Sequence, residues 1–450
     1  MIYQRTRGRI GGRVMSGLNG QHSGRAGMLS GVAAAIAGMT LNWASSPGNL
    51  LPSGFSLTRA SDGTYFDSAG LLQTAATDVA RGTYRYNGSA WVFDGTINEA
   101  ETTNLCIRST KLADAAWTAA GTSLTADQSV YLDGTTTMAS EVSTVANLAY
   151  GAVYLSYEYP TAGIAVSANT EYVNSIDVKR KQGTNGFRLF WAVSGFTSGV
   201  YADFDLTNGV CSTVGTIGTG SSTGTPRIEN MGGGIYRCSV SGKLDAATTT
   251  GYLIPAITKG YQDTATFTPT AGDGFYVAGA QVELGNAPTS RIATGAASAT
   301  RAADVVTATT SGLLVNGQGF AAIGYRTIAS GTTAAQLSTW TGSGSMLVTT
   351  NATTAFVYNG VNIGQVACTP QVAGEVEKIA STWVAGSYLQ IAANGTVGTQ
   401  AALAGNMNNG ATIRIGDHVS ALSEPISMVL QSMRLGVQTV NNSRLANPFA

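Results

Sequence analysis

Two pairs of carboxylates are the strongest candidates for catalytic chemistry in this sequence of 450 residues. Glu99 and Glu101 are two residues apart, and so are Asp203 and Asp205. On a strand, residues two apart share a face and lie roughly 6–7 Å apart, which suggests a glycosidase pair. A solvated strand edge is the other interpretation. It is favoured for Asp203 and Asp205, which flank Phe204 in an alternating pattern.

The other reactive residue types do not form a catalytic pattern. Residues 220–224 (GSSTG) match the nucleophile elbow of serine hydrolases, but no strand–turn–helix context surrounds them. The sequence has two histidines, His22 and His418, and neither shows a recognisable catalytic spacing to a nucleophile. No glycine loop precedes a helix to hold a phosphate. We therefore expect a protein that is not an enzyme, with no catalytic residue and no cofactor.

The four cysteines do not predict a metal site or a disulfide framework. Cys106, Cys211, Cys238 and Cys368 include no CxxC pair, and no histidine lies near them in the sequence. Cysteines this widely spaced in a long chain typically serve as small apolar side chains, in a protein made in a reducing cytoplasm. We expect no bound metal.

Aromatic side chains are better candidates for a binding site, because sugar-binding sandwiches stack the apolar faces of sugars on aromatic rings. Packing in a core or between subunits is the alternative for each of them, since aromatic side chains bury much area. The candidates are Tyr84, Tyr86 and Trp91 near the N-terminus, and Trp340, Trp383 and Tyr388 in the last third of the chain.

The elements that must position these residues are strands. Phe187, Leu189 and Trp191 alternate with other residues, and further stripes run through 201–206, 236–241 and 276–284. Such a period of two places one face of each strand on a core and the other in solvent. Asn-Gly pairs at 208–209, 359–360 and 394–395 are turn signals. Helix signals are nearly absent; the best is 32–39, which its glycine weakens.

Composition agrees with an all-β protein that is folded and neutral. Hydrophobic residues make up 44% of the chain and charged residues only 11%, so the chain can bury a core. There are 57 glycines, which suits many turns. The formal net charge is zero, which argues against a dedicated nucleic-acid binder.

The N-terminus differs from the rest of the chain in charge. Residues 1–61 carry six arginines and no acidic residue. We expect residues 1–50 to form a basic, glycine-rich arm that docks on an acidic partner, with a solvated tail as the alternative. The apolar stretch 28–41 superficially resembles a signal peptide, but we favour a mature segment. It is too short to span a bilayer as a helix. The anchoring residues of the arm are Arg5, Arg7, Arg9, Arg13 and Arg25.

Several motifs resemble recurring segments of bacteriophage virion proteins, a family that includes tail fibres, head fibres and spikes. Residues 55–72 (FSLTRASDGTYFDSAGLL) resemble one such module, and Glu99 to Leu105 resemble the acidic stretch and Thr-Asn-Leu motif that follow it. Residues 233–240 (GGIYRCSV) and 272–283 (GDGFYVAGAQVE) look like two strands of the family. Residues 288–290 (PTS) and 300–304 (TRAAD) close the module as the family does.

The resemblance implies tandem antiparallel β-sandwiches after an extended arm. Residues 51–104 would form a small β module, 105–300 a jelly roll similar to carbohydrate-binding modules, and 301–450 a concanavalin-type or laminin-G-type lectin sandwich. The last of these is supported by residues 379–383 (IASTW) and 413–416 (IRIG).

The resemblance also implies a function. We expect a structural protein on the virion surface that is made in the host cytoplasm. Its arm would anchor it to capsid, portal, collar or tail proteins, and its lectin-like domains would bind host surface glycans during adsorption. A tail-associated depolymerase or glycosidase is one alternative, and a secreted bacterial lectin is another.

We further expect a homotrimer. An isolated apolar stretch has no core of its own, and three copies around an axis would bury it. Phage fibres that resemble this chain are commonly trimeric. Burial against another virion protein is the rival interpretation. The residues to be buried are Met28, Leu29, Val32, Ile36, Met39 and Leu41.

Overall fold

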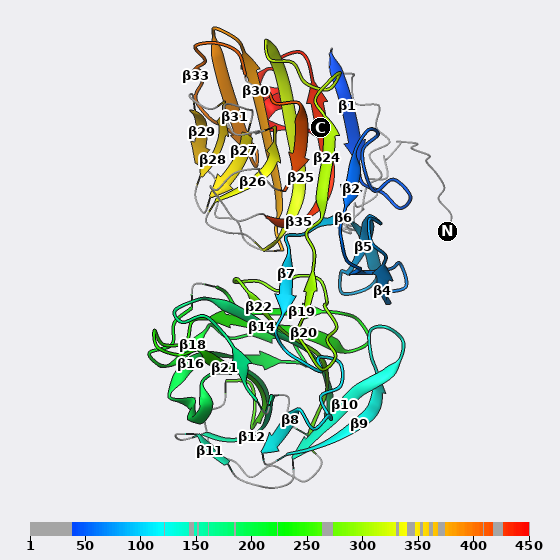
Figure 1. The fold of residues 1–450 in the computed structure, drawn as a ribbon, viewed down its shortest axis with the longest axis vertical. Helices are drawn as coiled ribbons and strands as arrows, with labels where there is room; N and C mark the ends of the chain where they lie inside the picture. The colour runs from blue at the N-terminus through cyan, green and yellow to red at the C-terminus, as the bar shows by residue number, and fades with distance from the viewer. Residues whose placement is uncertain are drawn as a thin grey trace, which may run out of the picture. The chain divides into compact units, whose positions relative to one another are not determined.

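The computed structural model describes residues 38–449, with gaps at 121, 144–147, 151–152, 161, 184–185, 223, 263–272, 330–332, 340–346, 352–353, 360–362, 368–373, 408 and 417–425. Within these residues almost every regular element is an antiparallel strand (Figure 1). A short 3-10 turn (Ser194–Phe196) and the helix α1 (Asn442–Ala446) are the exceptions in this part of the chain. The predicted all-β class is confirmed.

The C-terminal sandwich is built from two sheets that use strands from both ends of the chain. In the described residues the first sheet runs β32-β31-β30-β25-β35-β6-β5, with β1 added to β35 and β33 added to β31. Its strands are β1 (Met39–Ala44), β5 (Arg81–Tyr86), β6 (Trp91–Asn98), β25 (Gln318–Ala329), β30 (Val376–Val384), β31 (Tyr388–Ala393), β32 (Thr396–Val397), β33 (Ala401–Ala402) and β35 (Ser427–Gly436).

The second sheet of this sandwich runs β2-β24-β34-β26-β27-β28-β29. It too takes a strand from the N-terminal segment, because β2 pairs with β24. Its strands are β2 (Ser56–Thr58), β24 (Val305–Thr309), β26 (Thr333–Ser338), β27 (Leu347–Asn351), β28 (Thr354–Tyr358), β29 (Ile363–Ala367) and β34 (Thr412–Ile415).

The middle of the chain forms a second sandwich. One sheet runs β19-β20-β14-β22-β10-β9, and the other runs β11-β12-β21-β15-β16-β17, with β8, β13 and β18 attached. The first consists of β9 (Thr122–Val130), β10 (Thr136–Ser143), β14 (Tyr172–Gln182), β19 (Arg227–Asn230), β20 (Ile235–Gly242) and β22 (Gly274–Leu284). The second consists of β8 (Trp117–Ala120), β11 (Leu148–Tyr150), β12 (Val153–Pro160), β13 (Ile164–Ala165), β15 (Gly186–Ala192), β16 (Ser198–Asp205), β17 (Val210–Cys211), β18 (Gly215–Gly218) and β21 (Thr250–Thr258).

The two sandwiches are nested in the sequence, where we expected a tandem order. The chain leaves the first sandwich through β7 (Thr102–Asn104) and returns through β23 (Ala299–Arg301), and these two strands pair with each other (Figure 1). The expected boundary near residue 300 therefore coincides with the return strand. The expected small module 51–104 keeps only the hairpin β3 (Gly63–Phe66) and β4 (Leu72–Ala75) as a sheet of its own. Strands this short bury too little surface alone, so the rest complete the C-terminal sandwich.

The N-terminal arm is also shorter than expected. Met39 to Ala44 form β1, which pairs with β35, and Leu41 packs against the core of the C-terminal sandwich. Met39 and Leu41 are therefore half-buried by the chain itself, and Trp43 of the same strand is buried. The compact body comprises residues 35–450, and residues 1–34 form a separate unit that lies outside the described residues.

Each sandwich has a core with a buried tryptophan at its centre. Trp191 packs with Phe187 and Leu189 in the middle sandwich, as the alternating stripe predicted, and Trp383 packs in the C-terminal one. The opposite face of β15 differs from the expectation. Arg188 and Phe190 were expected in solvent but are only 3% and 0% exposed. The reason is that Phe190 belongs to a second apolar cluster on that face.

The turn at 394–395 shows how local sequence sets strand register. Asn394 and Gly395 have φ values of 48° and 88°, the left-handed pair that a two-residue hairpin requires. Ala393 and Thr396 pair across it, which confirms the predicted turn. At 208–209 the loop is longer, because Asp205 and Val210 are the paired residues. The predicted turn at 359–360 extends into residues that are not described.

Candidate functional site

The carboxylate of Glu99 is buried in an ion-pair network. Ser290 donates to it from its backbone N–H (2.7 Å) and its hydroxyl (2.6 Å). Arg81 and Arg301 lie 2.9 and 3.3 Å from Oε2. Burial alone would raise the pKa of Glu99, but Arg301, Arg81 and the Ser290 hydrogen bonds lower it to about 2. Glu101 is exposed, so the two do not act as a pair.

Asp304 extends this network and binds two arginines. Arg59 Nη1 lies 2.9 Å from Oδ1, and Arg81 bonds to Oδ2. The backbone N–H of Glu99 also donates to Asp304 Oδ2, at 2.9 Å. Residues of the motifs 55–72, 288–290 and 300–304 thus meet in one buried cluster. We call Arg59, Arg81, Glu99, Arg301 and Asp304 the joint network.

Asp203 and Asp205 are structural as well, but they are buried where a solvated face was expected. Asp203 accepts two hydrogen bonds from Arg188, at 2.7 and 2.8 Å. Asp205 accepts from the backbone N–H groups of Thr207 (2.8 Å) and Asn208 (3.2 Å) and so shapes the following turn. Both carboxylates are buried and hydrogen-bonded within the fold.

The remaining chemical candidates contribute no site within the described part of the chain. No three His, Cys, Asp or Glu residues gather there as metal ligands. Cys211 and Cys238 are free thiols, Cys106 is buried, and burial raises the pKa of Cys211. His22, His418 and Cys368 lie outside the described residues, and so does Thr223 of the GSSTG segment. No described helix is long and apolar enough to cross a membrane.

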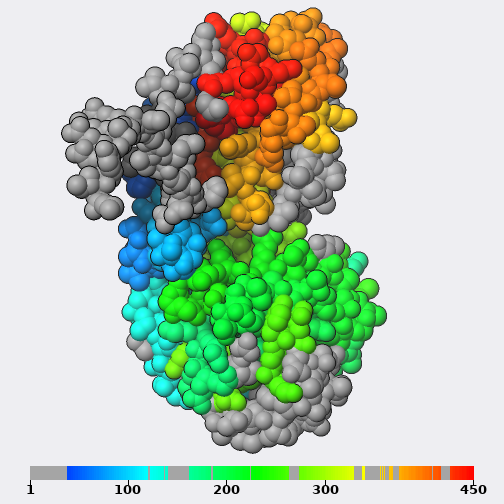
Figure 2. All heavy atoms as spheres, turned by 180° about the vertical axis from the view of Figure 1, so that it is seen from behind, coloured from blue at the N-terminus to red at the C-terminus, as the bar shows by residue number. Residues whose placement is uncertain are grey.

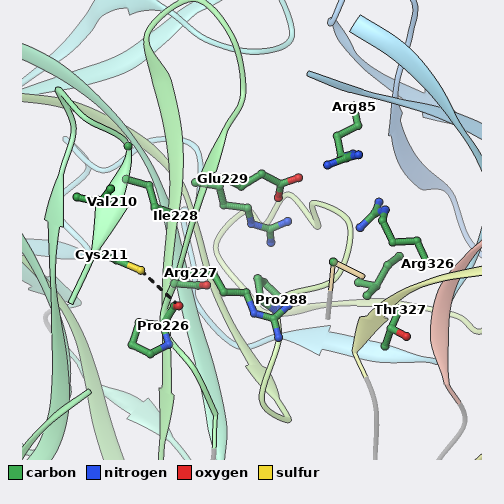
Figure 3. A pocket seen from close by; sticks show the side chains of 15 residues that line it. Arg85, Val210, Cys211, Pro226, Arg227, Ile228, Glu229, Pro288, Arg326 and Thr327 are labelled. Carbon is green, nitrogen blue, oxygen red and sulfur yellow. Dashed lines mark hydrogen bonds between the residues drawn. The ribbon is translucent and has the colours of Figure 1, made fainter. Parts of the chain in front are cut away.

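A cleft of about 570 Å³ opens where β5, β19, β20 and β25 approach one another. Its charged lining comprises Arg85 of β5, Arg227 and Glu229 of β19, Arg237 of β20 and Arg326 of β25. Figure 3 shows Arg85 and Arg326 opposite Arg227 and Glu229. The cleft therefore presents four guanidinium groups and one carboxylate.

The arginines of this cleft differ in how they are held. Arg326 bonds to Asp94, with Nε 2.8 Å from Oδ2. Arg237 donates to the Thr289 carbonyl at 2.7 Å and to Ser175 at 3.2 Å. Burial and the positive charge of Arg291 lower the pKa of Arg237 to about 10, although nearby carboxylates partly oppose this shift. No hydrogen bond or ion pair to another described residue occupies the side chains of Arg85 and Arg227.

A smaller cavity of about 100 Å³ adjoins the cleft and shares Arg85, Glu229 and Arg326 with it. Tyr65, Phe66 and Tyr84 form its aromatic part. The hairpin β3–β4, which carries Tyr65 and Phe66, contacts the middle segment of the chain, since Thr64 Oγ1 donates to the Arg291 carbonyl at 2.6 Å. In Figure 2 the N-terminal residues, in blue, lie at the surface next to green residues of the middle segment.

The aromatic candidates separate into three groups. Tyr84 lines the smaller cavity, packs edge-on against Phe93 and is half-buried. Trp91 and Tyr86 are half-buried beside it, and Trp91 stacks on Phe66 with ring centroids 5.2 Å apart. Tyr388 is half-buried at the start of β31, away from the residues that line the cleft.

Trp383 is not available to a ligand. Its ring is 0% exposed, and its Nε1 donates to the Val315 carbonyl at 3.2 Å. It is a core residue, as the alternative interpretation held. Trp340 and the anchoring residues Arg5, Arg7, Arg9, Arg13 and Arg25 lie outside the described residues.

The sequence reasoning missed the arginines of the cleft. Arg227 and Glu229 are two apart on β19, so their shared face could have been predicted. That this face looks toward Arg85 and Arg326 depends on how segments more than 90 residues apart in sequence pack in the fold. No local pattern carries that information.

Comparisons with known proteins return structures alone: no family model and no curated protein matches the chain. The carbohydrate-binding module CBM40 of Ruminococcus gnavus IT-sialidase, bound to alpha2,3 sialyllactose, is 12% identical with a TM-score of 0.25, and the match covers 30% of this chain and 84% of that one. The LG4-5 domains of the mouse laminin alpha1 chain are 11% identical with a TM-score of 0.23, covering 66% and 92%. The receptor-binding domain of a botulinum neurotoxin C/D mosaic serotype is 6% identical with a TM-score of 0.26, covering 33% and 41%.

These neighbours are a carbohydrate-binding module, laminin G domains and a receptor-binding domain. Their TM-scores are too low for a ligand of theirs to be transferred to this chain. Any site in this chain has to be argued from its own residues.

Proposed function

We propose that this chain is a structural protein of a bacteriophage particle that is not an enzyme and that binds a host surface glycan in the cleft between β5, β19 and β25. The observation that carries the proposal is the cleft itself. In it, two guanidinium groups that make no hydrogen bond or ion pair to another described residue lie beside an aromatic wall that includes Tyr84. Ligand sites typically combine apolar walls with a few placed polar groups in this way.

The carboxylates support a binding role over hydrolysis. A glycosidase needs one carboxyl group as acid and a second as base or nucleophile, on opposite sides of the bond that is cleaved. Glu229 is the carboxylate exposed in the cleft, whereas Glu99 is held ionised by Arg81 and Arg301. A carboxyl group with a pKa of about 2 is a poor proton donor near neutral pH.

The sequence motifs support the phage assignment. Four of the segments that resemble virion proteins meet at the joint network, where Arg59 binds Asp304 and Glu99 accepts hydrogen bonds from Ser290. The resemblance is thus carried by residues that hold the sandwiches together. In this proposal the protein is made in the host cytoplasm and lies on the virion surface as a fibre, spike or decoration.

Binding and turnover are tested together on the purified full chain. Calorimetry with host envelope polysaccharide should show binding, while an assay for reducing ends should show no release. Tyr84→Ala should weaken binding, whereas Tyr388→Ala, which changes a half-buried tyrosine outside the cleft, should not. Released reducing ends would establish the depolymerase alternative. A loss of binding in Tyr388→Ala alone would show that the glycan binds outside the cleft.

The virion assignment needs a separate measurement. Labelled antibodies against the chain should decorate the surface of intact phage particles in electron micrographs. Finding the chain secreted from bacteria that carry no phage would overturn the assignment and favour the secreted lectin.

A further inference from the structure

We infer that the ligand of the cleft is an acidic sugar whose carboxylate is bound between Arg85 and Arg227, an inference that rests on the glycan-binding function proposed above. It rests on a difference among the arginines that line the cleft: two are hydrogen-bonded within the fold, and two have no such partner among the described residues.

Two of the four arginines are already committed to the fold. Arg326 is bonded to Asp94, and Arg237 is 8% exposed with hydrogen bonds to Thr289 and Ser175. Arg85 is exposed and Arg227 half-buried, and the described residues offer neither side chain a hydrogen bond or an ion pair. These two guanidinium groups are the ones that a ligand can engage.

The electrostatics of the cleft favour an anion. Burial lowers the pKa of Arg227, Glu229 partly opposes this, and the positive charge of Arg326 lowers it further. Two guanidinium groups thus act on each other across the cleft. Asp94 pairs with Arg326, so Glu229 is the one lining carboxylate left to balance Arg85 and Arg227. An incoming carboxylate would relieve this repulsion, and the planar guanidinium can hold it with two parallel hydrogen bonds.

The shape of the site favours a sugar over a small inorganic anion. Arg85 lies where the cleft meets the smaller cavity, which Tyr65, Phe66 and Tyr84 line. A ring with an apolar face and a carboxylate substituent can contact an aromatic side chain and an arginine at once. Inorganic phosphate could use only the arginines.

The test compares acidic oligosaccharides with their neutral counterparts on the full chain. The probes are oligogalacturonate and oligosialic acid, each beside its carboxyl-reduced derivative, with inorganic phosphate as a competitor. We expect calorimetric binding of at least one acidic probe, roughly 10- to 100-fold tighter than its reduced form. Binding should weaken as salt is added, because part of each guanidinium group contacts solvent.

Variants identify the side chains that carry the effect. Arg85→Gln and Arg227→Gln should each lower affinity for the acidic probe roughly 10-fold or more and leave the reduced probe unchanged. Glu229→Gln should raise affinity for the acidic probe several-fold, because it removes a like charge. Arg180→Gln is the matched control, since Arg180 is exposed on β14 and bonds to the Gly183 carbonyl. Unchanged thermal unfolding shows that each variant is folded.

Each other outcome counts against a stated part of the inference. If the acidic and reduced probes bind equally, the inference that the ligand is acidic is overturned, while the proposed glycan-binding function stands. Binding of neither form of either probe, nor of host polysaccharide, overturns the proposed function itself. If phosphate displaces the acidic probe at equal concentration, the cleft is a general anion site, and the inference that its ligand is a sugar is overturned.

Discussion

At the scale of single residues, the protein is unusual in how many arginines it buries. Arg59, Arg81 and Arg301 are at most 2% exposed, yet the joint network contains only two carboxylates, Glu99 and Asp304. Backbone carbonyls accept the remaining donors, as where Arg59 Nη2 bonds to the Ala76 carbonyl at 2.7 Å. Removing one partner of such a network leaves a buried charge uncompensated, which typically costs about 3–5 kcal/mol.

Glu99 should therefore make the stability of the protein depend on pH. Its pKa is lowered from 4.5 to about 2 on folding. Its contribution is fully present above about pH 4.5 and is lost as the pH falls through 2, about 3 kcal/mol in total. Glu99→Gln should destabilise the fold at pH 7, with a smaller difference from the unchanged protein at pH 3. Urea unfolding at both pH values measures this.

Glu101→Gln is the control for that measurement, because Glu101 is exposed two residues away. It should unfold like the unchanged protein at both pH values. If Glu99→Gln lowers the free energy of unfolding by the same amount at pH 3 as at pH 7, the contribution of Glu99 to stability does not depend on its charge.

At the scale of elements, both sandwiches use glycine to make room for their buried tryptophan. A Cβ on Gly319 would lie 2.3 Å from the Trp383 ring, and Gly319 and Trp383 are paired between β25 and β30. A Cβ on Gly251 would lie 2.2 Å from the Trp191 ring. The glycines thus fix where the largest core side chain of each sandwich lies.

Gly319→Ala should accordingly destabilise the C-terminal sandwich by about 1–3 kcal/mol, because a rigid ring has to move in a close-packed core. Thermal unfolding followed by near-ultraviolet circular dichroism would report both the loss and the displaced tryptophan. Gly317→Ala is the control two residues away, since no atom lies within 4 Å of its Cβ position. Equal effects of the two changes would argue against the ring contact as the cause.

At the scale of the whole molecule, the middle sandwich is inserted into the other one. β6 leads into β7, the chain builds the middle sandwich, and β23 leads back to β24. The joint network lies on both crossings, since Glu99 follows β6 and Asp304 precedes β24. Residues 1–34 lie outside the described residues and contain the five arginines that we expect to anchor the chain.

The same division predicts the behaviour of a truncated chain. With β1 covered by β35, the apolar residues left for self-association are Met28, Leu29, Val32 and Ile36. We propose that the full chain is a trimer through this segment. A chain without residues 1–36 should be a folded monomer that no longer joins phage particles. Light scattering measures the masses, and thermal unfolding checks that the body is intact. A full chain that is monomeric at micromolar concentration would reject the trimer and favour docking on another virion protein.

The sequence by itself determined the class of fold and several local features. Alternation of apolar residues requires strands, and it placed Phe187, Leu189 and Trp191 in a core because side chains on a strand repeat with a period of two. Asn394 and Gly395 specified their turn, because few residues adopt positive φ at two successive positions. Tyr84 was singled out by type and position, and it lines the cavity beside the cleft.

Only the tertiary structure decided which faces meet. A period of two says that a strand has two faces but not what covers them, so Asp203 and Phe190 were expected in solvent and are buried. Strand pairing over long separations, such as β1 with β35, nested one sandwich inside the other. Packing between segments far apart in sequence brought Arg85, Arg227 and Arg326 to one cleft and left Trp383 inside a core. The fold is the arrangement that buries most apolar surface, and this arrangement depends on all segments of the chain together.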